Sequence, residues 1–263
     1  MRDDLEPLRD ALLRWYARAR RDLPWRRTTD PYAILVSEVM MQQTQVARVV
    51  PRYLEWLERW PTAAALAAAS RAEVLAAWVG LGYNRRALAL HAAATAVARD
   101  GWPADLRTLP GVGPYTAAAV GSFAFGAQVA AVDTNARRVA ERLGHGPPGA
   151  LLAPGRAADW NQAAMELGAT VCTARTPRCG ACPVARWCAS AGRAAVAPRA
   201  APGRGGSERF EDTNRWVRGR VVAALAAGDG LPGDIAPERL ERAVAGLVRD
   251  GLVRPVEGGF SLG

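Results

Sequence analysis

The strongest constraint on this chain is the placement of its cysteines. All four lie in one short segment, as Cys172, Cys179, Cys182 and Cys188, with the spacing Cys-x6-Cys-x2-Cys-x5-Cys. In an intracellular protein such a group is typical of a metal site rather than of disulfides. Four thiolates hold either Zn²⁺ or a [4Fe–4S] cluster, and zinc sites usually pair two Cys-x2-Cys knuckles. Because only one short spacing occurs here, the pattern favours the cluster, around which this segment must fold.

The charge of the chain points to a polyanionic partner. Its 263 residues carry 34 basic and 25 acidic side chains, a formal net charge of +9, and every one of the 34 is arginine. Clustered arginines bind phosphates, as in nucleic acids. The absence of lysine excludes P-loop NTPases and enzymes that form a lysine Schiff base. We find neither an apolar run long enough to span a membrane nor a signal peptide, so we expect a cytoplasmic, nucleoid-associated protein without membrane contact.

Apolar periodicity and capping signals predict a chain made almost entirely of helices. Asp30-Pro31 marks a helix start, and Ser70 with Glu73 forms a capping box. The predicted helices run over about 5–16, 30–50, 70–79, 85–99, 115–124, 133–143, 157–171, 214–227 and 237–249. We expect no strand before residue 250, and then a hairpin formed by 252–256 and 259–262. Two helices followed by a hairpin are typical of a winged-helix module.

A glycine turn, Leu109-Pro-Gly111-Val-Gly113, lies between two predicted helices. Glycine permits a left-handed backbone and close approach of another chain. The free N–H groups of the helix that follows can bind a phosphate without reading its base. A plain packing joint between two helices is the alternative for so short a motif.

The turn and the cysteines together resemble one known superfamily. The stretch from Leu109 to Ala117 is similar to the helix–hairpin–helix of base-excision DNA glycosylases, and the cysteine spacing is similar to that of their endonuclease III and MutY branches. The segments Trp25-Arg26, Ser37–Val46 and Gly80–Tyr83 resemble the MutY-type adenine glycosylases. The resemblance covers about residues 8–192.

This resemblance implies an all-α glycosylase fold with two helical lobes, a six-helix barrel and an iron–sulfur cluster lobe. We accordingly divide the chain into a glycosylase domain (1–192, with the cluster loop at 172–188), a linker (193–213) and a winged-helix-like α+β tail (214–263). The tail is too short for the Nudix-like domain that often ends such proteins. Its charges nearly balance, and its apolar residues have the spacing of a packed core. We therefore expect the tail to tune the preference for 8-oxoguanine rather than to clamp DNA.

Three residues are candidates for the chemistry. Glu38 lies on the apolar stripe of its helix, and burial raises the pKa of a carboxyl group, as a general acid requires. The resemblance assigns to Glu38 the protonation of adenine. Asp133 alone would be read as a helix cap, whereas the resemblance gives it a role toward the positively charged sugar, which a carboxylate can either stabilise or trap covalently. Tyr115 stands where glycosylases with lyase activity carry lysine, which indicates a monofunctional enzyme.

The resemblance also supplies binding residues. It places Arg26 and Gln162 in the adenine pocket, with Trp25 and Arg21 near them, and it makes Asn135, close to Asp133, a substrate- or DNA-binding residue. Gly111 and Gly113 are expected to bind a DNA phosphate. We call Gln43, Leu81 and Tyr83 the wedge residues, because they resemble side chains that enter the DNA stack beside the orphaned guanine. Leu81 has the alternative of a simple loop anchor.

The sequence therefore predicts a monomeric DNA glycosylase that releases adenine mispaired with 8-oxoguanine or guanine in double-stranded DNA. One alternative is a related thymine or uracil mismatch glycosylase, which also carries tyrosine at the position of Tyr115. The segment Gln42-Gln43-Thr44 and Arg26 favour adenine. The other alternative is a non-catalytic DNA-binding protein with a cluster, against which Glu38 and Asp133 argue.

Overall fold

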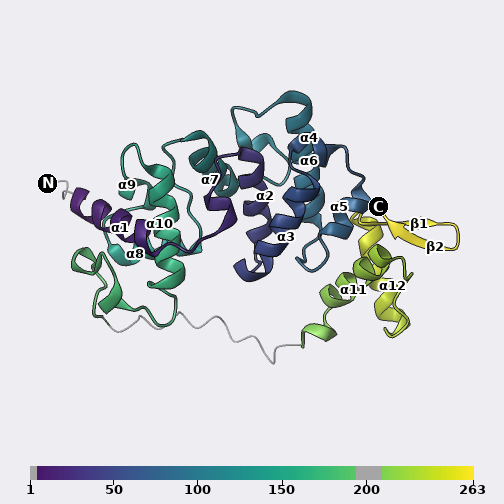
Figure 1. Cartoon of the computed structure of the whole chain (residues 1–263). Coiled ribbons are helices and arrows are strands. Elements are labelled where there is room, and N and C mark those ends of the chain that lie inside the picture. Colours follow the sequence, from purple (N-terminus) through teal and green to yellow (C-terminus); the bar gives the residue numbers. More distant parts are fainter. Residues whose placement is uncertain (1–4, 194–208) are drawn as a thin grey trace. The chain divides into compact units, whose positions relative to one another are not determined.

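The structure is a computed structural model that describes residues 5–193 and 209–263. It is helical almost throughout, and within the described residues the strands are confined to the segment after Leu252 (Figure 1). The prediction of an all-α fold with a small α+β tail is confirmed. None of the described helices is long and apolar enough to cross a membrane. The chain divides into two units, each built from two separate stretches of sequence.

The first unit takes the described residues of Met1–Ile34 and Val112–Arg204. Its helices are α1 (Glu6–Ala19), α7 (Pro114–Phe125), α8 (Thr134–Leu143), α9 (Pro148–Leu151) and α10 (Ala157–Thr170). Helix α10 packs against α1, α7 and α8. Apolar side chains at helical spacing, among them Leu8, Leu12, Trp160 and Leu167, form its buried core, and the cysteine loop packs on the same core.

The second unit takes the described residues of Leu35–Gly111 and Gly205–Gly263. Its first part holds α3 (Val46–Arg59), α4 (Ala63–Ala67), α5 (Arg71–Ala77) and α6 (Arg85–Asp100). Trp56 lies at its centre, with edge-to-face contacts to Trp60 and Trp78. The predicted capping box of Ser70 and Glu73 is present at the start of α5. Helix α2 (Pro31–Met41) crosses the boundary between the two units, at Ile34 and Leu35.

One predicted helix is wrong in its extent. The expected helix over 30–50 is interrupted after Met41, and α3 then continues to Arg59 with Pro51 inside it. At the interruption, Gln43 adopts a left-handed backbone with φ 57°. A residue other than glycine rarely takes this conformation without support from its surroundings. The support comes from a side chain of α6, described below, which local sequence does not reveal.

The C-terminal part of the second unit has the predicted order of helix, helix and hairpin. It comprises α11 (Asn214–Ala227), α12 (Pro237–Arg249), β1 (Val253–Val256) and β2 (Gly259–Leu262), with the strands antiparallel. Helix α11 and strand β2 both pack against α5. Of the five apolar residues expected in its core, Val221, Val244 and Leu247 are buried, whereas Leu225 and Leu240 are half-buried. The tail boundaries remain a prediction, and most of the predicted linker, residues 194–208, lies outside the described residues.

Candidate functional site

Glu38 is placed by a helix that is buried on every side. The Asp30 carboxylate caps α2 by accepting hydrogen bonds from the backbone N–H groups of Tyr32 (3.1 Å) and Ala33 (3.3 Å). Every residue from Tyr32 to Met40 is buried, and Glu38 itself is only 4% exposed. The predicted burial of Glu38 is confirmed.

Two of the wedge residues share an unusual backbone. Gln43 follows the end of α2, and Tyr83 precedes α6; both have positive φ, 57° and 49° respectively. Gln43 is exposed and Tyr83 is 41% exposed, whereas Leu81 is buried. The structure therefore presents Gln43 and Tyr83 outward and uses Leu81 in packing.

Arg86 links the two loops that carry these residues. Its guanidinium donates hydrogen bonds of 2.6–3.2 Å to the end of α2 and to both loops. The acceptors are the backbone carbonyls of Val39, Met40, Gln42, Leu81 and Gly82 and the hydroxyl of Thr44. Burial lowers the pKa of Arg86 to about 10, so the side chain still carries its charge at neutral pH. A single cation thus holds Gln43, Tyr83 and the helix of Glu38 in one arrangement.

Gly111 and Gly113, the two glycines of the predicted phosphate turn, occupy their positions for different structural reasons. Gly111 has φ 75°, and a Cβ added there would lie 2.6 Å from the Cβ of Ala89 on α6, so only glycine fits. Gly113 begins α7 as its N-cap, without a side-chain cap, and Pro114 takes the first helical position. Both glycines are exposed. The backbone N–H groups in the first turn of α7 therefore have no side-chain cap at Gly113, the arrangement in which a helix start can bind a phosphate.

Asp133 is the N-cap of α8, as its sequence context predicts. Its carboxylate accepts hydrogen bonds from the backbone N–H of Ala136 (2.6 Å) and from the side-chain amide of Asn135 (2.9 Å). The Asn135 oxygen in turn accepts from Arg138 Nη2 (2.7 Å). A Cβ added to Gly168 of α10 would lie 2.6 Å from that of Asn135, so α8 and α10 approach closely. Asp133 is thus held in one orientation while remaining partly exposed.

Two of the four predicted adenine-pocket residues, Arg21 and Arg26, meet around Glu166, a residue that was not among the predicted site residues. Glu166 lies on α10 and its side chain is fully buried. Arg21 binds its carboxylate with two bonds of 2.8 Å, and Arg26 binds it with one of 2.7 Å. Burial alone would raise the pKa of Glu166, but the hydrogen bonds from Arg21 and Arg26 outweigh it and lower this pKa to about 2. A charged residue within the apolar run of α10 was the available signal.

Three further predicted residues lie in the same unit. Gln162 accepts a hydrogen bond from the hydroxyl of Tyr16 (2.7 Å), and the Arg26 guanidinium lies 5.5 Å from the centre of the Tyr16 ring. Trp25 is buried. Tyr115, in the first turn of α7, directs its hydroxyl toward the sulfur of Met165 at 3.9 Å. Tyr115 therefore lies beside the residue that precedes Glu166 on α10.

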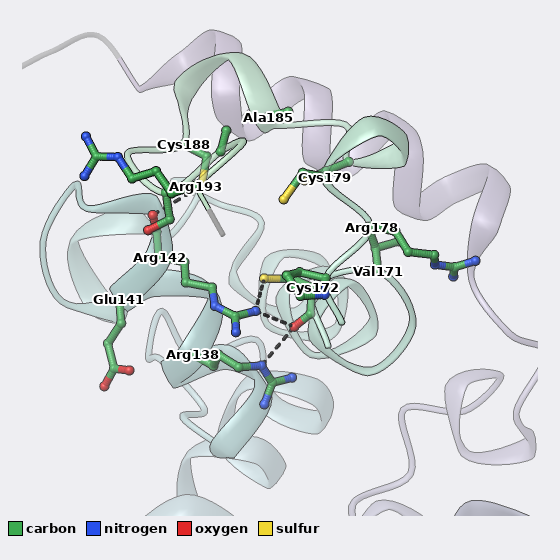
Figure 2. Close-up of a pocket in the computed structure, with 14 residues that line it drawn as sticks. Arg138, Glu141, Arg142, Val171, Cys172, Arg178, Cys179, Ala185, Cys188 and Arg193 are labelled. Carbon is green, nitrogen blue, oxygen red and sulfur yellow. Dashed lines mark hydrogen bonds between the residues drawn. The ribbon is translucent and has the colours of Figure 1, made fainter. Parts of the chain in front are cut away.

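All four cysteines line a single cavity of about 410 Å³ (Figure 2). Their thiols are free, and burial raises the pKa of Cys182, with the other three thiols adding to the effect. Within residues 5–193 and 209–263, no three His, Cys, Asp or Glu side chains are grouped so as to hold one metal ion. A cavity of this volume, lined by every cysteine of the chain, fits a multi-atom cluster held by four thiolates. Cys172, Cys179, Cys182 and Cys188 are the residues that would hold it.

Arginines from α8 brace this loop. Arg142 donates to the Cys172 sulfur (3.3 Å) and to the carbonyl of Thr173 (2.8 Å), and Arg138 donates to the carbonyl of Cys172 (2.9 Å). The dashed lines of Figure 2 show both arginines converging on Cys172. Their positive charge offsets the negative charge that four thiolates bring. Neither arginine was expected from the cysteine motif itself.

Two family models match the chain. The HhH-GPD superfamily of base excision DNA repair proteins matches residues 36–149, and the iron–sulfur binding domain of endonuclease III matches residues 172–188. The second match covers the four cysteines from first to last. It bears out a [4Fe–4S] cluster as the cofactor.

Among curated proteins, the chain is similar to adenine DNA glycosylases from bacteria and animals. It is 46% identical to that of Mycobacterium tuberculosis (strain CDC 1551 / Oshkosh) over 282 residues, which cover 95% of this chain and 92% of the relative. It is 43% identical to the Homo sapiens protein over 215 residues, covering 70% of this chain and 39% of the human one.

The fold also matches solved structures. A thermostable thymine-DNA glycosylase is 29% identical with a TM-score of 0.65, over 70% of this chain and 95% of that one. An endonuclease III trapped as a covalent intermediate with DNA is 24% identical with a TM-score of 0.61, over 73% and 97% of the two chains. The latter likeness shows the shared fold.

Proposed function

This chain belongs to the adenine DNA glycosylase family of base-excision repair proteins, and we propose that it releases adenine mispaired with 8-oxoguanine or guanine in double-stranded DNA. The observation that carries the proposal is the burial of Glu38, a carboxyl group on a helix whose residues from Tyr32 to Met40 are all buried. We expect the protein to act as a monomer on chromosomal DNA in the cytoplasm.

The proposed reaction is hydrolysis of the bond between adenine and deoxyribose. Glu38 donates a proton to N7 of adenine, the C1′–N9 bond breaks, and its electron pair leaves with the base. The Asp133 carboxylate stabilises the positive charge that develops on the sugar. Water then adds to C1′ and gives one proton back to the Glu38 carboxylate, which leaves free adenine, an abasic site and the enzyme in its starting state. The hydrogen bonds from Ala136 and Asn135 keep the Asp133 carboxylate oriented for this role.

The chain has no lysine with which to form an imine to the sugar, and Tyr115 stands at the position where a lyase would carry one. We therefore expect the enzyme to stop at the abasic site. Arg26, Gln162, Trp25 and Arg21 would line the adenine pocket, Gly111 and Gly113 would hold a phosphate, and the wedge residues would fill the stack. The cluster, when bound, supplies a rigid anchor for the loop from Cys172 to Cys188 rather than a reacting group.

Glycosylase assays on defined duplexes test this proposal. We expect release of adenine from A·8-oxoguanine and A·G pairs, with the strand breaking only after alkali. Strand breakage without alkali would reveal a lyase. Thymine opposite guanine is the second candidate substrate, because a thymine-DNA glycosylase shares the fold at 29% identity. Release of thymine in place of adenine would show that the protein is a thymine mismatch glycosylase.

Removal of either carboxylate tests the mechanism. Glu38→Gln and Asp133→Asn should each slow adenine release by about a thousandfold, the scale of acid–base catalysis. Binding to the mispaired duplex should persist, because neither residue is assigned to phosphate. Glu58→Gln is the matched control, because it removes an exposed carboxylate from the second unit and should leave the rate unchanged. A fully active Glu38→Gln enzyme would contradict Glu38 as the proton donor.

A further inference from the structure

Arg215, in the C-terminal tail, contacts the predicted wedge residue Tyr83. Its guanidinium carbon lies 3.9 Å from the centre of the Tyr83 ring, and its Nη1 donates a 2.8 Å hydrogen bond to the Tyr83 hydroxyl. The two residues are 132 positions apart in sequence and belong to the same unit. This one side chain therefore holds the tyrosine by its face and by its polar end.

Arg215 is itself placed by an anchored helix. It lies in the first turn of α11, where the Thr213 side chain caps the helix by accepting from the backbone N–H of Trp216. Helix α11 packs against α5 (Figure 1). The side chains of Val217 and Val221 on α11 are fully buried. The cap and the packing of α11 fix the backbone of Arg215 at a position from which its side chain reaches Tyr83.

The Tyr83 loop is built to receive this contact. Its backbone has φ 49°, and Arg86 holds the carbonyls of Leu81 and Gly82 that precede it. Gly82 has φ 70°, a left-handed backbone that favours glycine, and a Cβ added there would lie in ordinary contact with Nη2 of Arg215, at 3.4 Å. Arg86 thus fixes the backbone, and its guanidinium carbon lies 5.6 Å from the centre of the Tyr83 ring. Arg215 lies closer to the ring and also binds the hydroxyl of Tyr83, a residue that is 41% exposed.

We propose that Arg215 is a positioning residue that keeps the Tyr83 ring ordered before DNA arrives, so that the tail contributes to mispair recognition through Tyr83. The inference rests on the proposed function, because it takes Tyr83 as a wedge residue. An exposed side chain that is already ordered loses less rotational freedom when it is inserted between bases. This gain in affinity arises only when the Tyr83 ring enters a base stack that has been disrupted. We therefore expect it for mispaired DNA and not for fully paired DNA.

The main experiment compares two arginines of α11. Arg215→Ala removes the contact, and Arg220→Ala removes the same charge from the same helix at a side chain that pairs with Asp234 instead. Affinity is measured for an A·8-oxoguanine duplex and for a fully paired duplex of the same length. We expect Arg215→Ala to reduce the ratio of the two affinities by about five- to tenfold, the scale of the entropic cost of ordering one side chain at an interface. Arg220→Ala should preserve the ratio.

Each other outcome overturns the proposal. An equal loss on both duplexes would make Arg215 a phosphate contact, and a gain in the ratio would make the contact inhibitory. An unchanged ratio would leave Arg215 without a part in recognition. Arg215→Lys keeps the charge but lacks the flat, forked guanidinium, so it should restore the ratio only in part. Full recovery would assign the effect to charge alone.

A second measurement separates this inference from the proposed function. In urea unfolding, Arg215→Ala, Tyr83→Phe and the double variant form a cycle that needs no DNA. We expect the double variant to unfold at the same urea concentration as Arg215→Ala, because the hydrogen bond is lost in both. Strict additivity would overturn the ordering of Tyr83 by Arg215, whatever the enzyme excises. A wild-type protein that releases no adenine, with the coupling intact, would instead contradict the proposed function.

Discussion

The two units hold their candidate site residues with opposite electrostatic arrangements. In the first unit, one fully buried carboxylate, Glu166, gathers the two arginines Arg21 and Arg26. In the second unit, one arginine, Arg86, gathers five carbonyl oxygens and a hydroxyl. In the first arrangement, two guanidinium cations neutralise a carboxylate. In the second, the neutral dipoles of carbonyl and hydroxyl groups surround one guanidinium cation.

The difference has consequences for how each unit responds to pH. The pKa of Glu166 is about 2 because hydrogen bonds from its arginines outweigh the effect of burial. Arg86 keeps its proton up to a pKa of about 10. Acid therefore weakens the centre of the first unit and leaves that of the second unit charged. Substitutions at these centres test the contrast.

The largest effect is expected at Arg86. Arg86→Met fills similar space but removes the charged donor that six oxygen acceptors share. The carbonyls of Leu81 and Gly82 keep neutral donors in Thr44 and Trp78, but the link that Arg86 makes between the two wedge loops is lost. We expect the free energy of unfolding to fall by about 4 kcal/mol, as for the loss of a buried polar network. Urea unfolding at pH 7 measures it, with the exposed neighbour changed in Arg85→Met as the control, for which we expect about 0.5 kcal/mol or less. If the free energy of unfolding fell no further than in the control, the two wedge loops would keep their conformation without Arg86.

A slightly smaller effect, which depends on pH, is expected at Glu166. Its pKa falls from 4.5 to about 2 on folding, which corresponds to a stabilisation on the order of 3 kcal/mol at pH 7. A carboxyl with a lowered folded pKa stabilises the protein above its unfolded pKa and loses this contribution as pH falls. The deficit of Glu166→Gln should therefore shrink between about pH 5 and pH 2. The deficit of Arg86→Met should stay constant over this window; parallel curves for both variants would remove the contrast.

The local signals in the sequence predicted much of this fold. The cysteine spacing located the cluster loop, the Ser70–Glu73 capping box opened α5 as expected, and the C-terminal hairpin formed over the predicted residues. Each of these depends on residues within a few positions of one another. For the same reason, the N-cap role of Asp133 was readable from three consecutive residues.

What the sequence did not reveal depends on distant partners. The interruption after Met41 is held by Arg86, more than 40 residues away, so the apolar pattern alone extended the helix through it. Glu166 meets Arg21 and Arg26 across 145 and 140 residues. The contact of Arg215 with Tyr83 likewise joins segments that only the tertiary fold brings together. Periodicity finds a buried face, but it does not identify the partner of a charge on that face.

The smallest expected effect distinguishes the two arginine partners of Glu166, Arg21 and Arg26. Arg21 is 42% exposed and Arg26 is 10% exposed, although Arg21 makes the two-bonded contact. Water screens an exposed ion pair, and Arg21→Ala leaves Glu166 charged and bound to Arg26. We expect Arg21→Ala to lower the free energy of unfolding by about 1 kcal/mol and Arg26→Ala by about twice as much. Arg18→Ala, an exposed arginine at the end of α1, is the control in the same urea experiment. If Arg21→Ala were the more damaging of the two, the two-bonded geometry would outweigh burial in this unit. Glu166 would then depend mainly on the partner that water reaches.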